Sequence, residues 1–157
     1  MGRVLARHLP ALSAHYDYCL IDCPPALGML VINGLAACET LIVPMQTEDL
    51  ALRSLDRLLR TLELYRNSSG RAVPYLVVPT MFDRRTRASR DSLLRLRCRN
   101  DIDLWPDYIP VDTQIREASR LGLPLTHWQP ESRAADAYIR LSDVLTKQRP
   151  QQVRIAS

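Results

Sequence analysis

The chain has 157 residues, of which 46% are hydrophobic and 24% charged, a composition that favours one folded domain over a disordered chain. No apolar run approaches the roughly 18 residues of a membrane span, and early charges argue against a secretory signal peptide. The net charge of +4 comes from 20 arginines and one lysine, and the five glycines include no Gly-Lys pair. A self-contained P-loop of the form G-x-x-x-x-G-K-[ST] is therefore excluded, because its lysine would have to reach the phosphates.

The first half of the chain predicts alternating helices and buried strands. Apolar residues at helical spacing predict a short helix over residues 3–14. Tyr18–Asp22, stopped by two prolines, predicts a buried strand that ends in an acid. Residues 27–38 are almost wholly apolar and predict a buried helix, and Leu41–Pro44 predicts a second buried strand. The clearest helix is predicted over residues 48–66, with Thr47 as its N-cap and Asn67–Gly70 as its end.

The second half continues the same alternation. It predicts a strand at Tyr75–Pro79, a basic helix over about 87–99 and a short strand at Leu104–Ile109. A further helix begins near Asp112 or Thr113 and stops at Gly122, and the last runs from a cap at Ser132 through Leu145. The fold class is therefore α/β, a mostly parallel sheet flanked by helices, with ligand positions at the carboxyl ends of the strands.

Cysteine and tryptophan usage points to structure rather than chemistry. The cysteines at positions 19, 23, 38 and 98 form no C-x-x-C pair and stand apart from the three histidines, which argues against zinc or a disulfide framework. We expect reduced thiols in buried apolar places. Trp105 and Trp128 are expected to pack in the core or at its rim.

Three segments could carry chemistry, and each has a purely structural alternative. Asp22, before Cys23-Pro24-Pro25, could hold Mg²⁺ directly or through water, or could cap the next helix. Residues 84–99 hold seven arginines against one acid and could neutralise phosphates, or could form a solvated helix face. Pro110-Val111-Asp112-Thr113 could frame a base, or could simply start a helix.

Taken in order, the motifs resemble the ParA/Soj/MinD family of deviant-Walker ATPases over residues 3–147. Residues 16–28 resemble the family's Walker B and switch II segment, and residues 79–86, Pro-Thr-Met-Phe-Asp-Arg-Arg-Thr, resemble T-M-[FY]-D-x-R-T. Residues 43–48, 109–119 and 130–138 continue the match. Within the family, residues 74–86 and 105–113 look like the ParC-type proteins encoded beside chemotaxis and flagellar genes.

The resemblance implies a role for several residues. Asp22 would be the Walker B acid near Mg²⁺, through a water, and Cys23 and Pro24 would belong to switch II. Met81, Asp83, Pro110 and Asp112 would lie around the adenine of ATP. Arg85 matches an arginine linked to non-specific DNA binding, with Arg84, Arg87 and Arg116 as further candidates; the second family arginine falls on Gln114 here.

The resemblance also implies a parent function and a departure from it. The family uses ATP-dependent dimerisation to partition or position cargo in the bacterial cytoplasm, at the nucleoid or the pole. Its members form homodimers and work with DNA or a polar scaffold and with a ParB-like or chemotaxis-array partner. Its opening K-G-G-x-G-K-T loop is absent here. Residues 1–148 would therefore be the C-terminal part of one ATPase domain, with 149–157 as a flexible tail.

The missing part limits what we expect of this chain. The family's first strand lies between the Walker B strand and the next strand, so its loss would leave a gap or two unpaired edges. With Walker A and its lysine absent, no catalytic residue is assigned, and we expect little or no binding of ATP and Mg²⁺. The alternative is a non-catalytic module that binds DNA or a partner through its arginine-rich face; a third possibility is another enzyme of the same superfamily.

Overall fold

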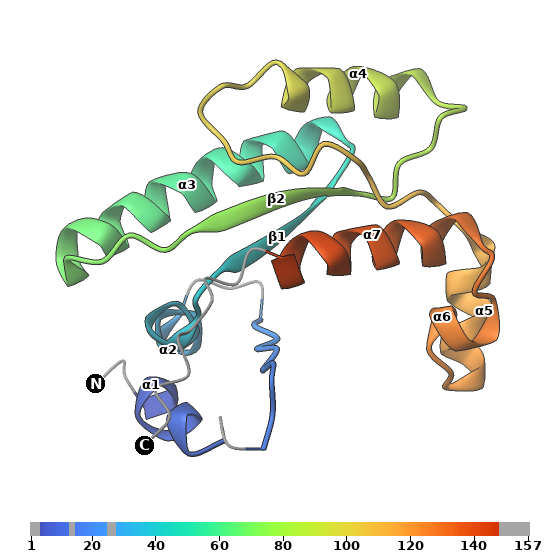
Figure 1. Cartoon of the computed structure of the whole chain (residues 1–157). Helices are drawn as coiled ribbons and strands as arrows, with labels where there is room; N and C mark the ends of the chain where they lie inside the picture. The colour runs from blue at the N-terminus through green and yellow to red at the C-terminus, as the bar shows by residue number, and fades with distance from the viewer. Residues whose placement is uncertain (1–3, 13–14, 25–27, 148–157) are drawn as a thin grey trace.

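The computed structural model describes residues 4–12, 15–24 and 28–147. Figure 1 shows its elements in chain order: α1 (Val4–His8), η1 (Leu9–Leu12), α2 (Met29–Ala37), β1 (Leu41–Gln46), α3 (Asp49–Ser69), β2 (Tyr75–Thr80), α4 (Arg87–Arg97), α5 (Thr113–Leu121), α6 (Leu125–Trp128) and α7 (Arg133–Lys147). The predicted tail at 149–157 lies outside the described residues. No helix in the described part is long and apolar enough to cross a membrane.

The described sheet has two parallel strands, β1 and β2, in a register that sets Leu41 opposite Tyr75. The predicted strand at Leu104–Ile109 is wrong, because only isolated parallel bridges form there, including one between Val77 and Leu104. Pro106 interrupts this segment, and a proline has no N–H to continue a ladder. The segment still follows β2, since Ile109 N donates to the carbonyl of Pro79 at 2.8 Å.

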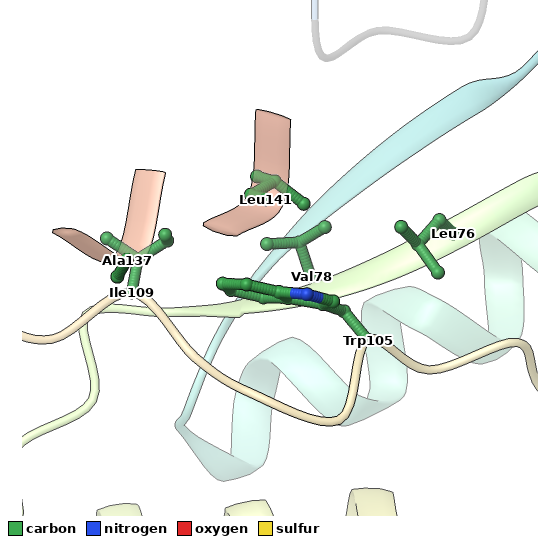
Figure 2. Packing of buried hydrophobic residues seen from close by; sticks show 6 residues of the cluster. All are labelled: Leu76, Val78, Trp105, Ile109, Ala137 and Leu141. Carbon is green, nitrogen blue, oxygen red and sulfur yellow. The ribbon is translucent and has the colours of Figure 1, made fainter. Parts of the chain in front are cut away.

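Helices cover the sheet on two faces, as expected for an α/β fold (Figure 1). On one face α3 and α4 contribute Leu55 and Leu96 to a cluster around Val77. On the other face α7 packs Ala137 and Leu141 against β2; Figure 2 shows this cluster, whose buried members are Leu76, Val78, Trp105, Ile109, Ala137 and Leu141. The prediction of Trp105 as a core residue is confirmed, since it is 2% exposed.

Most helix boundaries follow the predicted signals. α3 ends at Gly70, whose φ of 71° is the left-handed conformation that glycine tolerates best. Gly122 ends α5 in the same way with φ 67°. Ser132 caps α7, because its hydroxyl accepts from the Ala135 amide at 3.1 Å. Thr47 is not the N-cap of α3: Glu48 holds that position, without a side-chain capping bond.

The predicted buried strand at Tyr18–Asp22 does not form. The structure assigns no strand there, and Leu20 is 88% exposed. A strand needs a neighbour to satisfy its N–H and C=O groups. The only described strands are β1 and β2, and they pair with each other.

Two further expectations need correction. The first predicted helix is only one turn of α-helix, α1, followed by the 3-10 turn η1, which contains Pro10. The cysteines are not generally buried: Cys19, Cys23 and Cys98 are exposed and Cys38 is half-buried. Cys19 and Cys23 lie on the segment that fails to join the sheet, which explains their exposure.

Candidate functional site: the loops at the carboxyl ends of the strands

The chain brings two of the predicted motif segments together beyond the end of β2. Phe82 and Pro110 form a parallel bridge, in which Phe82 N donates to Ile109 O at 3.1 Å and Val111 N to Phe82 O at 3.0 Å. The rings of Phe82 and Tyr108 lie 4.2 Å apart, centroid to centroid. Met81 and Asp83 therefore lie on one side of a bridge whose other side leads into Asp112. We call residues 81–85 and 108–112 the loop cluster.

Met81 occupies a strained backbone position within the loop cluster. Its φ of 53° lies in the left-handed region, and it is the only described non-glycine residue there. Its side chain is 60% exposed, so burial of that side chain does not account for the conformation. Strain of this kind persists where neighbouring contacts hold the backbone, and it is frequent at binding sites.

A buried pair of hydroxyls supplies those contacts. Thr47 Oγ1 and Ser89 Oγ lie 2.5 Å apart, and both residues are buried. Thr47 Oγ1 also donates to Met81 O at 3.4 Å, and Ser89 Oγ accepts from Asp83 N at 3.1 Å. The pair therefore joins the end of β1, the first turn of α4 and the strained turn at Met81.

The Asp83 carboxylate is engaged by its neighbour Arg85. The Arg85 Nε lies 2.9 Å from Oδ1 and the Nη2 lies 2.8 Å from Oδ2, a two-pronged pairing of guanidinium and carboxylate. The Arg85 amide also donates to Oδ1 at 3.0 Å. These bonds lower the pKa of Asp83 to about 2, the side-chain bond from Arg85 being the main cause. The same bond raises the pKa of Arg85.

Asp112 works as a double helix cap. Its Oδ1 accepts from Gln114 N at 3.0 Å and N-caps α5, while its Oδ2 accepts from Ala134 N at 3.4 Å in the first turn of α7. The simpler alternative, a residue that starts the next helix, is thus what the structure shows. Pro110 is buried, whereas Asp112 is half-buried.

The Walker B-like segment stays apart from the loop cluster. Asp22, Cys23 and Pro24 are exposed, and the described residues include no hydrogen bond or ion pair between them and the loop cluster. A Cβ built on Gly34 would lie 3.0 Å from Cys23 Sγ, so this segment rests against α2 instead. Pro25, also in the predicted motif, lies outside the described residues.

The residues present do not by themselves fit Mg²⁺ and a nucleotide. Magnesium prefers several oxygen ligands, yet the described residues hold no group of three acids, histidines or cysteines. Asp22 is a single exposed carboxylate, and the carboxylates of Asp83 and Asp112 are already used. The one lysine, Lys147, lies at the end of α7. No cradle of glycine amides for phosphates is present in the sequence.

Two arginines of the arginine-rich segment, Arg95 and Arg99, pair with acids on α3. Arg95 bonds Asp49 at 2.8 Å, and Arg99 bonds both Asp56 and Asp101 at 2.6 Å. Arg97 donates to a backbone carbonyl. The pairs Arg95–Asp49 and Arg99–Asp56 therefore join α4 and its following loop to α3, and the sequence could not show them because these two acids are distant in the chain.

A smaller basic surface remains exposed near the start of α4. Arg84 and Arg90 are exposed and form no ion pair within the described part of the chain, and Arg87 reaches Asp91 only at 3.5 Å. Arg116 on α5 is also exposed and without an ion pair there. We call Arg84, Arg87 and Arg90 the basic edge of α4.

Sequence reasoning missed two groups that organise the site. The only sequence signal for the hydroxyl pair Thr47–Ser89 is a threonine directly after a buried strand. That position predicts a helix N-cap instead. Arg71 donates to Leu35 O at 2.8 Å and to Cys38 O at 2.5 Å, and so closes the end of α2. An arginine in a loop gives no sign in sequence of the carbonyls that it reaches.

Comparison with known proteins finds relatives in the ParA/Soj family. A family model described as an AAA domain matches residues 2–73. The chain is 34% identical over 139 residues to the sporulation initiation inhibitor protein Soj of Bacillus subtilis, covering 88% of this chain and 55% of Soj. It is 34% identical to the chromosome partitioning protein ParA of Caulobacter vibrioides, covering 90% of this chain and 54% of ParA.

Solved structures show the same fold. Cobyrinic acid a,c-diamide synthase from Mycobacterium smegmatis, solved also with ADP and magnesium, is 33% identical with a TM-score of 0.72, covering 91% of this chain and 52% of the synthase. McdA of Cyanothece, as an ATP complex, has a TM-score of 0.77 at 21% identity, covering 95% of this chain and 59% of McdA. The chain thus spans little more than half the length of the proteins that it matches.

Proposed function

Since this chain belongs to the ParA/Soj/MinD family, we propose that it is the C-terminal part of a partition ATPase and does not hydrolyse ATP by itself. The observation that carries the proposal is the collinear match to Soj over 88% of the chain. The bridge between Phe82 and Pro110 supports it, because it joins the two segments to which the family resemblance assigns the adenine contacts. The synthase shares the fold, but ParA of Caulobacter vibrioides matches at similar identity and is named a chromosome partitioning protein.

In the complete protein, the proposed roles follow the family motifs. Met81, Asp83, Pro110 and Asp112 would border the adenine, and Asp22 with Cys23 and Pro24 would belong to the phosphate and Mg²⁺ side. In this chain alone these residues bind no nucleotide tightly, since Asp83 and Asp112 are engaged and the phosphate cradle is missing. The complete protein would dimerise with ATP in the bacterial cytoplasm, at the nucleoid or pole.

Titration calorimetry with Mg-ATP on the purified chain tests this proposal. We expect no saturable binding at micromolar ATP and no phosphate release. The positive control is full-length Soj, of which this chain covers 55%. Prepared in the same way, it tests that the assay detects binding. Micromolar binding by the 157-residue chain alone would overturn the proposal.

The second candidate is a non-catalytic module that binds DNA or a protein partner. The observation that favours it is the basic edge of α4, with exposed Arg84 in the turn before the helix and exposed Arg87 and Arg90 in the first turn of α4. Phosphates could be neutralised there without sequence readout. Arg85 contributes less than the family motif implies, because its guanidinium is paired with Asp83.

Charge reversal tests the interface of the second candidate. Arg84→Glu together with Arg90→Glu should weaken binding to non-specific duplex DNA at least tenfold at low salt, whereas Arg53→Glu on α3 should change it less than threefold. Fluorescence anisotropy with a labelled duplex measures both. Equal loss in the two variants would remove the basic edge as a specific interface and leave only the general charge of the protein.

The cargo belongs to the same proposal at a finer level. The resemblance of residues 74–86 and 105–113 to ParC-type proteins favours a chemotaxis array at the pole as cargo over a chromosome or plasmid. The proposed partner is a ParB-like or array protein, and the proposed active form is a homodimer. Neighbouring genes test the choice: chemotaxis genes beside the coding sequence would support an array, and a ParB-like gene would support DNA.

A further inference from the structure

We propose that the outward face of α3 is a docking surface for an acidic amphipathic helix of a partner protein. The surface, which we call the α3 row, consists of Leu50, Arg53, Arg57, Arg60 and Leu64. It lies outside residues 84–99 and is distinct from the basic edge of α4. The inference requires neither ATP binding nor DNA binding, so it is tested separately from the proposed function.

The α3 row runs along the side of α3 that faces away from the sheet. Its positions are spaced by three and four residues in turn, the spacing at which side chains share one face of a helix. The opposite face supplies the buried residues Leu55, Leu62 and Tyr65. Leu50 is 74% and Leu64 is 69% exposed, and the three arginines between them are exposed as well. The row is therefore a solvent-facing strip about 21 Å long, which corresponds to about four helical turns.

The arginines of the row are free because the nearest acids of α3 pair elsewhere. Asp49 stands one turn before Arg53, at the four-residue spacing of an ion pair within a helix, and Asp56 stands in the same relation to Arg60. Both carboxylates instead bond arginines of α4 and its following loop, at 2.8 and 2.6 Å. Within the described part of the chain, Arg53, Arg57 and Arg60 form no ion pair. The row thus offers three positive charges to an outside partner.

Three free arginines between two exposed leucines match carboxylates flanked by apolar side chains. A guanidinium pairs with a carboxylate through two parallel hydrogen bonds, and arginine is enriched in protein interfaces. Apolar side chains at the two ends of the same partner would remove Leu50 and Leu64 from water. A helix provides this arrangement, because its side chains repeat at the same three- and four-residue spacing. The partner segment is therefore a helix of about four turns, with apolar residues at its ends and acids between them.

Duplex DNA and a second copy of this chain match the row less well. Phosphates would neutralise the arginines, but the phosphate backbone offers nothing apolar to the two leucines. Glu63, which pairs with Arg66 only at 3.9 Å, also places a carboxylate beside the row. A helix can keep its acids away from Glu63, whereas phosphates follow one another along the strand. A second copy would set arginines opposite arginines, an unfavourable arrangement of like charges.

A synthetic peptide tests the proposal on the full chain. The probe is a labelled helical peptide of about three heptads, with leucines at its ends and three glutamates between them at the spacing of the row. Fluorescence anisotropy at low salt measures its binding. We expect saturable binding that weakens at least tenfold when the three glutamates are replaced by glutamine. The glutamine peptide keeps the length and the leucines, so the difference measures the charge contacts.

Charge reversal shows where the peptide binds. Arg57→Glu together with Arg60→Glu should weaken binding of the glutamate peptide at least tenfold, whereas Arg84→Glu together with Arg90→Glu should change it less than threefold. The two double variants alter the net charge equally, so a difference between them does not come from overall charge. All four arginines are exposed, so the melting temperature of the chain should stay unchanged. For duplex DNA we expect the opposite order of effects.

Two further measurements test the apolar contacts and the charge match. Leu64→Ser should weaken peptide binding at least threefold without a change in charge. Leu94→Ser, at a leucine of α4 that is 58% exposed, is the control and should change binding less than twofold. A peptide with lysines in place of the glutamates should bind the Arg57→Glu, Arg60→Glu variant at least tenfold more tightly than the unaltered chain.

Four results would overturn the proposal. The first is the absence of saturable peptide binding up to about 1 mM. The second is equal loss of peptide binding in the two double variants, which would leave only general attraction between opposite charges. The third is a loss of DNA binding in the Arg57→Glu, Arg60→Glu variant as large as in the basic-edge variant, which would make the row a nucleic-acid surface. The fourth is a doubled mass of the free chain that the same variant abolishes, which would mean that a second copy covers the row.

None of these readouts depends on ATP. Failure of the peptide experiments would therefore leave the proposed function standing, and ATP binding by the chain alone would leave the α3 row proposal standing.

Discussion

Polar side chains in the loop cluster are held by the protein itself before any ligand arrives. Asp83 accepts four hydrogen bonds from Arg85, Asp112 caps two helices, and the Ser89 hydroxyl accepts a hydrogen bond from the Asp83 amide. Such bonds fix geometry, but they also occupy the groups that a ligand would use. A nucleotide that contacts Asp83 would have to share its carboxylate with Arg85 or displace Arg85. The Asp83–Arg85 pair therefore determines whether Asp83 can contact a ligand.

The Asp83–Arg85 pair predicts a defined pH response. The pKa of Asp83 is lowered to about 2, from an ordinary value near 4, so the pair stabilises the fold above about pH 4 and its contribution is lost as pH falls through 2. At pH 3.5 we expect the Asp83 carboxylate to be almost fully ionised, as followed by carbon-13 NMR. In Arg85→Ala the protonated fraction at that pH should rise, because the side-chain bond is lost while the backbone amide of residue 85 still donates to the carboxylate. Arg84→Ala is the control and should change nothing; equal effects would contradict the pairing.

The buried hydroxyl pair predicts a stability effect. Ser89→Ala leaves the Asp83 amide without its acceptor and removes one partner of Thr47. We expect the free energy of unfolding to fall by about 1–3 kcal/mol in urea titration, because buried donors are left unsatisfied. Ser54→Ala, an exposed serine on α3 that bonds only its own helix, should stay within about 0.5 kcal/mol. A Ser89 variant as stable as the Ser54 variant would refute the role of the pair.

Among the elements, α2 depends most on contacts from outside itself. It is a short apolar helix with only Gly34 and Leu35 buried, and no side chain caps its N-terminus. Its C-terminal end is closed by Arg71, from the loop before β2, which reaches Leu35 O, Ala36 O and Cys38 O. A guanidinium suits the negative end of a helix, where carbonyls lack partners. Arg71 thereby holds the helix that contacts both β1 and residues 19–23.

Removal of Arg71 therefore tests the hold on α2. Arg71→Ala should lower the free energy of unfolding by about 1–2 kcal/mol, in the range for hydrogen bonds from a charged donor. Amide exchange should show faster opening in α2 than in α4. Arg60→Ala on α3 is the matched control, since Arg60 is exposed and forms no hydrogen bond or ion pair in the described structure. Equal exchange in α2 for the two variants would show that Arg71 is dispensable.

The sequence predicted the helices, whose hydrogen bonds and caps are local, and failed on a strand that needs a partner distant in the chain. Helix α3 followed from its spacing and from Gly70, and α7 followed from Ser132. The strand at Tyr18–Asp22 failed, because its apolar pattern reflects a sheet that the described chain does not complete. The motifs of the loop cluster were found, but the pairing of Asp83 with Arg85 was not. Residue types show what a position can do, whereas partners follow from the fold.

At the scale of the whole molecule, the formal net charge differs from the positive charge that is free to contact an anionic partner. The chain carries a formal charge of +4, and residues 84–99 hold seven arginines against one acid. Folding pairs three of these arginines, Arg85, Arg95 and Arg99, with the four acids Asp49, Asp56, Asp83 and Asp101. Exposed pairs contribute little to stability, but in each one the negative charge of the carboxylate offsets the positive charge that a phosphate would meet. The basic edge of α4 is what remains for an anionic partner.

The salt dependence of DNA binding measures how many arginines contact phosphates. Each neutralised phosphate adds about −0.9 to the slope of log K against log salt. If only Arg84, Arg87 and Arg90 contact phosphates, the slope should be about −3, whereas all seven arginines would give about −6. Anisotropy between low and physiological salt distinguishes these values.

Asp49→Asn should steepen the slope by about one unit, because it frees Arg95, while Glu63→Gln, away from the basic edge, should leave it unchanged. A slope near −6 for the unaltered chain would mean that DNA also contacts the arginines that are paired with acids in the free protein.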